Sequence, residues 1–253
     1  MTVKDRDLMG GLAKGLKVIE AFTAERPKLS IAEAADVTQY DRATTRRCLL
    51  TLAELGYCAY DGKYFTVTPR ILRLGTGCLA AMPLPRIIQP YLDQLSEQIH
   101  QSTSVSILDG NEIVYVARAA QQRVMTVTLM PGSRLPAYCT SMGRVLLAAL
   151  PEDQVKDLLV NEILSARTPK TETSPTRLLE KLQKIHEQGY AAIDQEVEMG
   201  LRSIAVPLTD FRKKTVAALN VGFAVTTESL DSMVQKYLPA LKAIQSEISG
   251  TLR

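Results

Sequence analysis

The segment from Asp41 to Pro69, DRATTRRCLLTLAELGYCAYDGKYFTVTP, decides how the first part of the chain is expected to fold. Aspartate is a preferred helix N-cap and glycine a common helix terminator, so the segment predicts a helix that begins after Asp41 and ends at Gly56. Two runs rich in β-forming residues, YCAY and YFTVT, then flank Asp61-Gly62-Lys63. Because Asp-Gly between such runs is a strong hairpin signal, we expect a β-hairpin directly behind the helix.

Two further helices are predicted in front of this segment. Residues 11–25 carry apolar side chains at helical spacing, and Pro27 ends the pattern. Ser30 and Glu33 then match the capping box that opens a helix. A short helix followed closely by a longer one is the helix-turn-helix arrangement, and the hairpin makes it a winged version.

The third predicted helix has one apolar side and one side of small and basic residues. At 100° per residue, the apolar side is expected to face the core, with Cys48, Leu49, Leu52, Ala53 and Leu55 on it. The outer side near its N-terminus combines arginine with small side chains. With the hairpin tip, the candidate DNA-binding residues are Arg42, Ala43, Thr44, Arg46, Arg47 and Lys63.

These residue types suit the grooves of double-stranded DNA. Arg47 can bond the N7 and O6 atoms of guanine in pairs, and Thr44 can contact a base edge or a thymine methyl group. Arg42 and Arg46 are better placed for phosphate, and Lys63 could reach the backbone or the minor groove. Arginines on an isolated helix are typical of an ordinary solvated face. The short helix in front and the hairpin behind favour DNA binding.

Composition and charge limit the remaining possibilities. The 253 residues are 46% hydrophobic and 23% charged, with a net charge of +3. Residues 1–75 carry 12 Lys/Arg against 9 Asp/Glu, so the positive excess lies in the first third. The four cysteines show no C-x-x-C spacing, which argues against zinc, and we expect no metal and no cofactor. Without a signal-peptide pattern or an apolar run of about 20 residues, we expect a cytoplasmic protein with no membrane contact.

The rest of the chain predicts a second domain. We expect the winged helix-turn-helix to cover residues 1–69 and a linker helix to cover 70–85, because Pro83-Leu84-Pro85 breaks the pattern. Residues 86–253 alternate helical and strand patterns, with RVMTVTLM (123–130) as one of the strands. This order predicts an α+β domain in which helices cover an antiparallel sheet.

One segment of this domain has the chemistry of an anion site. A proline-rich loop, residues 131–140, leads into Thr140-Ser141-Met142-Gly143 at the start of a helix. Free N–H groups at a helix N-terminus favour an anion. Arg134 and Arg144 flank this point, and arginine can hold a carboxylate with two hydrogen bonds. Each of these residues also fits a purely structural role, as a cap or in the core.

The two halves resemble the IclR family of transcriptional regulators. GLAKGLKVIEAF, LSIAEAADVT and RATTRRCLLTLAELGY resemble its winged helix-turn-helix, and PGSRLPAYCTSMGRVLLAALP and DQEVEMGLRSIAVPL resemble its effector-binding domain. The sequence PGSRLPAYCTSMGRVLLA is most similar to the corresponding segment in the branch of the family that controls aromatic-acid catabolism through the β-ketoadipate route. The resemblance implies a GAF-like fold whose pocket is lined by Leu135, Ser141, Met142, Leu201, Ser203, Asn220 and Gly222.

We therefore expect a transcriptional regulator, and not an enzyme, that senses a small carboxylic acid such as protocatechuate, 4-hydroxybenzoate or β-ketoadipate. Its expected partners are a palindromic or repeated DNA operator, a second copy in a homodimer or homotetramer, and RNA polymerase as a further candidate. Two alternatives remain open. One is a metabolite-sensing protein-interaction module without specific DNA binding. The other is an enzyme acting on an aromatic or dicarboxylic acid, for which Cys139, His186 and Glu196 are the candidate reactive groups without any supporting motif.

Overall fold

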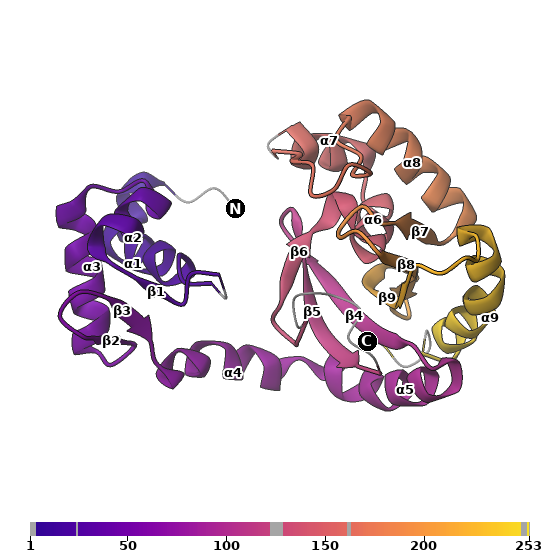
Figure 1. Cartoon of the computed structure of the whole chain (residues 1–253), viewed down its shortest axis with the longest axis horizontal. Coiled ribbons are helices and arrows are strands. Elements are labelled where there is room, and N and C mark those ends of the chain that lie inside the picture. The colour runs from indigo at the N-terminus through magenta and orange to yellow at the C-terminus, as the bar shows by residue number, and fades with distance from the viewer. Residues whose placement is uncertain (1–3, 24, 122–128, 161–162, 249–251, 253) are drawn as a thin grey trace. The chain divides into compact units, whose positions relative to one another are not determined.

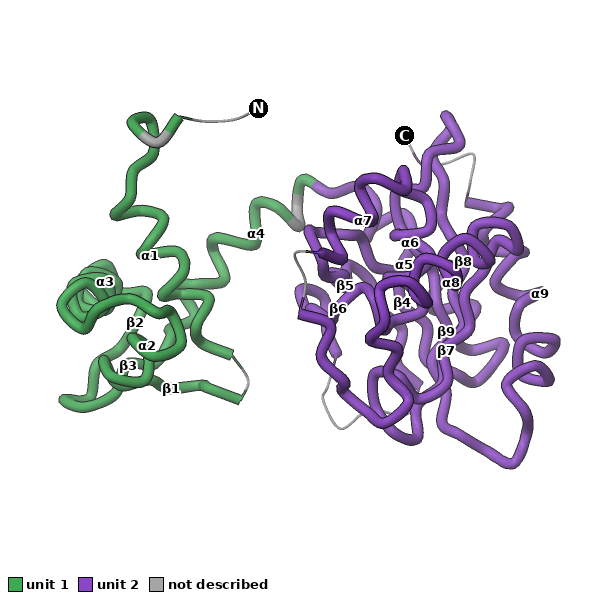
Figure 2. The backbone as a smooth tube through the Cα atoms, turned by 90° about the horizontal axis from the view of Figure 1, so that it is seen from above, with its two compact units in different colours: residues 1–81 green, residues 82–253 purple. Residues whose placement is uncertain are grey.

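The chain folds into two compact units, Met1–Ala81 and Met82–Arg253 (Figure 2). The computed structural model describes residues 4–23, 25–121, 129–160, 163–248 and 252. The second unit begins earlier than the sequence suggested. Pro83 and Pro85 lie in the first turn of a helix, where the missing proline N–H costs no helical hydrogen bond, so they begin the first helix of the second unit directly after the division at Ala81.

The first unit is a small helical domain with a three-stranded sheet. Its elements are η1 (Asp5–Asp7), α1 (Gly10–Glu20), β1 (Lys28–Leu29), α2 (Ile31–Thr38), α3 (Arg42–Glu54), β2 (Cys58–Tyr60), β3 (Phe65–Val67), η2 (Pro69–Ile71) and α4 (Leu72–Ala81). The strands pair antiparallel in the order β1-β3-β2. Strand β1 was not expected, because two residues carry no readable alternation.

Local hydrogen bonds explain why α2 and α3 begin where they do. The Ser30 hydroxyl accepts from the Glu33 N–H, and a Glu33 carboxylate oxygen accepts from the Ser30 N–H at 2.7 Å, which is the predicted capping box. Asp41 accepts from the Thr44 N–H at 2.8 Å and caps α3. Between the helices, Gln39 has a left-handed backbone (φ 60°), which turns the chain sharply. These bonds confirm the helix-turn-helix.

The second unit is a six-stranded antiparallel sheet covered by helices (Figure 1). The strand order is β6-β5-β4-β9-β8-β7. Its elements are α5 (Pro83–Ile99), β4 (Ser102–Asp109), β5 (Glu112–Ala119), β6 (Arg134–Pro136), η3 (Ala137–Cys139), α6 (Ser141–Ala148), α7 (Glu152–Val160), α8 (Pro175–Gln188), β7 (Ala191–Asp194), β8 (Leu201–Thr209), β9 (Thr215–Ala224) and α9 (Leu230–Ile248). The α+β fold is confirmed. The strand predicted at 123–130 lies almost wholly outside the described residues.

The two faces of this sheet differ in side-chain size. One face packs its large apolar residues, such as Ile204, Leu219 and Phe223, against α5 and α9. The other face lies under α6, with α8 packed behind that helix, and carries small residues such as Ala205 and Ala218. Because side chains alternate along a strand, one sheet supplies both surfaces. The face of small residues leaves room between the sheet and α6.

Helix α6 begins unusually close to the preceding turn. A Cβ atom on Gly143 would lie 2.2 Å from the Ala137 carbonyl oxygen and 2.5 Å from the Thr140 hydroxyl. Both distances are shorter than any real contact, so only glycine fits here. The Thr140 hydroxyl accepts from the Gly143 N–H at 3.1 Å and caps the helix. Gly143 therefore fixes where the first turn of α6 sits over the sheet.

Candidate functional site

Helix α3 presents a basic surface. Arg42, Ala43, Arg46 and Arg47 are all exposed, as the sequence predicted. In the part of the chain that the structure describes, no carboxylate lies within ion-pair distance of these three arginines. The Arg47 guanidinium makes only a long contact of 3.5 Å with the Thr44 hydroxyl. Arginines without a carboxylate partner remain free to bind phosphate oxygens or base edges.

Thr44 does not lie on this surface. Its side chain was expected to touch a base edge, but only 7% of the residue is exposed. Thr44 lines an apolar groove between α1 and α3, beside Leu12 and Cys48. The helical wheel placed it on a flank, and the packing of α1 against that flank covers it. The readable face of α3 therefore consists of arginines and Ala43. Leu55, expected in the core, is likewise exposed at the end of the helix.

The wing places Lys63 at an exposed tip. Strands β2 and β3 pair as the hairpin signal predicted, with Tyr60 opposite Phe65. At the turn, Asp61 Oδ1 accepts from the backbone N–H groups of Lys63 and Tyr64, at 2.9 and 2.7 Å. The ammonium of Lys63 lies 4.8 Å from the centre of the Tyr64 ring. The turn is thus held by its own hydrogen bonds, and its lysine remains exposed.

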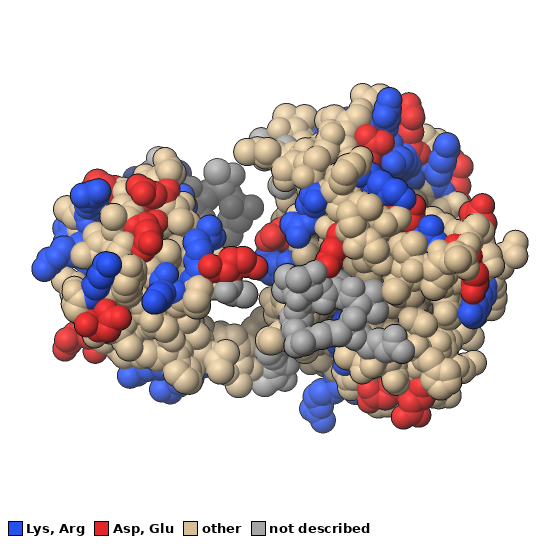
Figure 3. Space-filling model, in the orientation of Figure 1, with Lys and Arg blue, Asp and Glu red and all other residues tan. Residues whose placement is uncertain are grey.

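Charge on the molecular surface is mixed. On the face drawn in Figure 3, blue and red side chains alternate over both units, without a large area of one sign. This agrees with the small net charge of +3. Binding to a polyanion would therefore depend on particular cations, such as those of α3, more than on the overall field.

A pocket in the second unit lies between the sheet and the start of α6. Its volume is about 40 Å³. The lining residues are Ser102, Tyr115, Arg118, Leu129, Leu135, Thr140, Ser141, Met142, Val197, Leu201, Ser203, Asn220 and Gly222. All seven positions carried over from the family resemblance are among them. They come from β6, α6, β8 and β9, so residues far apart in sequence meet around one space.

Two lining residues, Arg118 and Asn220, belong to a polar row across three neighbouring strands. Ser104 on β4 pairs in register with Arg118 on β5 and with Asn220 on β9. A guanidinium N–H of Arg118 donates to the Ser104 hydroxyl at 2.9 Å. Residues in register on neighbouring antiparallel strands share a face, so all three side chains lie on the α6 side of the sheet.

Two polar atoms around the pocket have no hydrogen-bond partner among the described residues. They are Ser141 Oγ and Asn220 Oδ1, which are buried in residues that are 1% and 8% exposed. A buried polar group without a partner costs about 1–3 kcal/mol. Next to Asn220 on the same strand, a Cβ atom on Gly222 would meet nothing within 4 Å. The pocket thus offers unsatisfied hydrogen-bonding groups beside free space.

Arg134 and Arg144 do not line the pocket, and this corrects the expectation that both flank an anion. Arg134 is half-exposed and pairs with Glu112 at 2.6 Å and Asp109 at 2.8 Å. Arg144 is 2% exposed and donates two hydrogen bonds to Glu196, at 2.8 and 2.6 Å, and a third to the Tyr138 carbonyl at 2.7 Å. Each arginine already has its anionic partner within the protein.

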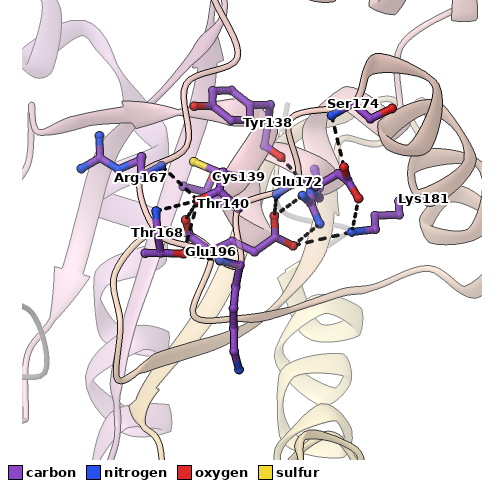
Figure 4. A network of polar contacts seen from close by, with 12 residues as sticks. Tyr138, Cys139, Thr140, Arg167, Thr168, Glu172, Ser174, Lys181 and Glu196 are labelled. Carbon is purple, nitrogen blue, oxygen red and sulfur yellow. Dashed lines mark hydrogen bonds and ion pairs between the residues drawn. The ribbon is translucent and has the colours of Figure 1, made fainter.

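The buried Glu196 joins α6 to the loop that forms one wall of the pocket. Figure 4 shows the polar network around it. Glu196 also accepts from the Glu172 N–H at 2.9 Å, and its backbone carbonyl accepts from the Thr171 hydroxyl at 2.7 Å. The next residue, Val197, lines the pocket. Arg144 and Glu196 therefore hold two walls of the pocket together without touching its interior.

Sequence reasoning missed Arg118. It is a half-buried cation that lines the pocket, and burial lowers its pKa, partly opposed by Tyr115. Burial raises the pKa of Tyr115 to about 12, with a smaller opposing effect from Arg118. The signal in the sequence was a single arginine interrupting the apolar strand IVYVARAA. A charge in such a strand is expensive unless it is used.

The candidate reactive groups do not form a catalytic set in the described residues. Burial raises the pKa of the Cys139 thiol to about 11. His186 Nδ1 lies 2.8 Å from the Ala148 carbonyl oxygen, and Glu196 belongs to the buried ion pair. No cluster of three or more potential metal ligands occurs among the described residues. Within the same residues, no single helix is long and apolar enough to cross a bilayer.

A winged helix-turn-helix with exposed arginines, carried on the same chain as an α+β domain with a small, partly polar pocket, is typical of a DNA-binding regulator with an effector domain. Family models support this class at both ends of the chain. Residues 11–62 match the IclR helix-turn-helix domain, and residues 76–250 match the bacterial transcriptional regulator IclR C-terminal domain. The chain belongs to the IclR family of transcriptional regulators.

The chain is similar to three characterised or structurally solved proteins of this family. The Pca regulon regulatory protein of Pseudomonas putida is 42% identical over 249 residues, covering 98% of this chain and 86% of the relative. An IclR-family regulator from Brucella abortus has a TM-score of 0.84 at 26% identity, covering 98% and 95% of the two chains. A double mutant of the inducer-binding domain of PobR from Acinetobacter, in a complex with 3-hydroxybenzoic acid, has a TM-score of 0.63 at 30% identity, covering 68% and 100% of the two chains.

Proposed function

We propose that this chain is a cytoplasmic regulator of aromatic-acid catabolism genes that binds its effector, an aromatic carboxylic acid or its ring-cleavage product, in the pocket between the sheet and α6. Protocatechuate, 4-hydroxybenzoate and β-ketoadipate are the candidate acids. The observation that carries the proposal is the pair of buried, unsatisfied groups, Ser141 Oγ and Asn220 Oδ1, beside open space. The complex of the PobR double-mutant domain with 3-hydroxybenzoic acid supports the same chemical class.

In this proposal, the protein binds DNA as an oligomer. One short recognition helix supplies few base contacts, so two or four copies on a palindromic or repeated operator are needed for specific affinity. We assign Arg47 to base recognition, and Arg42, Arg46 and Lys63 to phosphate. Ala43 allows the helix to approach the groove closely. RNA polymerase is a further proposed partner, and we assign the chain no enzymatic activity.

The effector must favour one state of the regulator over the other. A ligand that binds both states equally shifts no equilibrium, however tightly it binds. We infer that the acid changes the geometry or the population of the DNA-bound oligomer. By linkage, operator DNA must then change the affinity for the acid by the same factor.

Footprinting and acid binding test the proposal together. Purified full-length protein is incubated with DNA flanking its own gene, with and without each candidate acid, against excess random DNA. We expect a protected site, a thermal shift with at least one acid, and a change in the footprint or the affinity when that acid is present. No protected site under any condition would refute the DNA-binding part. A protected site without any thermal shift would refute the effector part.

A further inference from the structure

Arg118 is the only guanidinium among the described residues that line the pocket, and no carboxylate within those residues pairs with it. Its contact there is the neutral Ser104 hydroxyl at 2.9 Å. The neighbouring segment 122–128, QRVMTVT, contains no acidic residue. Two other arginines of this domain with little exposure, among the described residues, each have a carboxylate partner: Arg144 pairs with Glu196, and Arg202 pairs with Asp194 at 2.6 Å.

Arg118 is a half-buried cation that faces the pocket, and no anionic partner among the described residues offsets the cost of its desolvation. Desolvation disfavours its charged form, which is why burial lowers its pKa. An incoming carboxylate would supply the missing partner and could accept two hydrogen bonds from the planar guanidinium. Because Ser104 already holds one guanidinium nitrogen, the group is oriented before any ligand arrives.

The rest of the lining describes the remainder of the ligand. Leu129, Leu135, Met142, Val197 and Leu201 are apolar, so they suit a flat hydrocarbon body. Asn220 stands in the same cross-strand row as Arg118, on the far side of Ser104. Its free Oδ1, together with Ser141 Oγ, can bond a further polar group. A second carboxylate would find no second described cation in this lining.

We propose that Arg118 is the carboxylate-binding residue of the pocket and that it selects an aromatic monocarboxylate bearing a hydroxyl group over a dicarboxylate. This inference rests on the proposed effector pocket. It specifies which residue binds the carboxylate and that the acid carries one carboxylate. It replaces Arg134 and Arg144, whose carboxylate partners are already inside the protein.

A comparison of an acid with its neutral amide isolates the charge interaction. Isothermal titration of the full-length wild-type chain uses 4-hydroxybenzoate and 3-hydroxybenzoate, each with its neutral amide (4-hydroxybenzamide and 3-hydroxybenzamide), and then protocatechuate and adipate. A hydrogen-bonded charge contributes about 1.5–3 kcal/mol. We therefore expect the hydroxybenzoate that binds most tightly to bind roughly 10- to 150-fold more tightly than its amide. Adipate should bind more weakly than that hydroxybenzoate.

Substitution of the arginine should remove this difference. In Arg118→Gln, the acid should lose most of its advantage, whereas the amide should bind nearly as in the wild type. Arg118→Lys should retain part of the preference, because it keeps the charge without the planar fork. The matched control is Arg134→Gln, which removes an arginine from strand β6, outside the pocket lining, and should leave both affinities unchanged.

The outcomes separate this inference from the proposed function. Wild-type protein that binds none of the acids would overturn the proposed effector pocket, and the inference with it. Wild-type protein that binds the acid and its amide equally, or adipate best, would overturn the inference alone. The same holds if Arg118→Gln keeps the full preference for the acid. If Arg118→Gln does not fold, the wild-type comparison and Arg118→Lys still decide.

Discussion

Removal of Glu196 should destabilise the second unit strongly, because it leaves Arg144 buried without its anion. The two side chains are 3% and 8% exposed and share two hydrogen bonds, at 2.8 and 2.6 Å. Breaking a buried ion pair by removing one partner costs about 3–5 kcal/mol. In Glu196→Ala, the Arg144 guanidinium keeps only its bond to the Tyr138 carbonyl. The Glu172 N–H also loses its acceptor.

Calorimetry of the full-length chain can measure this loss. For a unit of this size, each kcal/mol shifts the melting temperature by about 2–4 °C, so the transition of the second unit should fall by roughly 6–20 °C. The control is Glu180→Ala, which removes an exposed glutamate from α8 and should shift the transition by less than about 2 °C. A double variant, Arg144→Met with Glu196→Leu, removes both charges and should be more stable than Glu196→Ala.

A Glu196→Ala variant that melts at the same temperature as the Glu180→Ala control would refute this prediction. That result would mean that water or a rearranged side chain satisfies Arg144, and that the pair does not hold the pocket walls together. The same variant should weaken acid binding, because Val197 follows Glu196 directly and lines the pocket. Normal stability with lost acid binding would point to a role for Glu196 in the pocket itself.

Three further predictions address the pocket, the DNA surface and the partly buried ion pair of Asp194 with Arg202. Gly222→Leu should fold and bind operator DNA but lose acid binding in titrations, because its new side chain enters the open pocket; intact acid binding would place the ligand elsewhere. Arg47→Ala should reduce the binding free energy for the operator by about 1–3 kcal/mol and relax the sequence preference in anisotropy assays. Arg46→Ala should weaken binding to operator and random DNA similarly and reduce the salt dependence of binding. If Arg47→Ala also weakened binding to operator and random DNA equally, the assignment of Arg47 to base recognition would be wrong. Burial would raise the pKa of Asp194, but hydrogen bonds from Arg202 and Lys170 outweigh it and lower the pKa from 3.8 to about 2. Its stabilisation, about 1–2 kcal/mol, is therefore complete above about pH 4 and lost as the pH falls from about 4 to 2, so Asp194→Asn should flatten that part of the stability profile; an unchanged profile would show that the pair contributes nothing.

Most elements of the first unit could be predicted from the sequence, because the signals for them are local. Ser30 and Glu33 specify a helix start from four residues, and Asp61-Gly62 specifies a hairpin turn, so neither depends on distant parts of the chain. The burial of Thr44, in contrast, could not be predicted from local sequence. Its place on the α3 wheel was read correctly as a flank, but whether a flank is covered depends on α1, which lies about 30 residues earlier.

The pocket was harder to predict because partners of charged residues are set by the tertiary fold. Arg134 and Arg144 stand beside the helix start in the sequence, but their anions, Glu112 and Glu196, lie on other elements. Arg118 stands far from that helix in sequence and reaches the pocket only through strand pairing with Ser104. The seven positions that do line the pocket came from the family resemblance, and residue chemistry alone did not identify them.

The unequal faces of the central sheet have a consequence for how such regulators diversify. One apolar core of the domain, with Ile204, Leu219 and Phe223, packs against α5 and α9, whereas Ser203, Asn220 and Gly222 lie on the other face, toward the space under α6. In the proposed effector pocket, substitutions at these three positions would alter which metabolite is recognised while leaving the hydrophobic packing on the opposite side intact. A single scaffold could in this way acquire new chemical preferences in a few mutational steps.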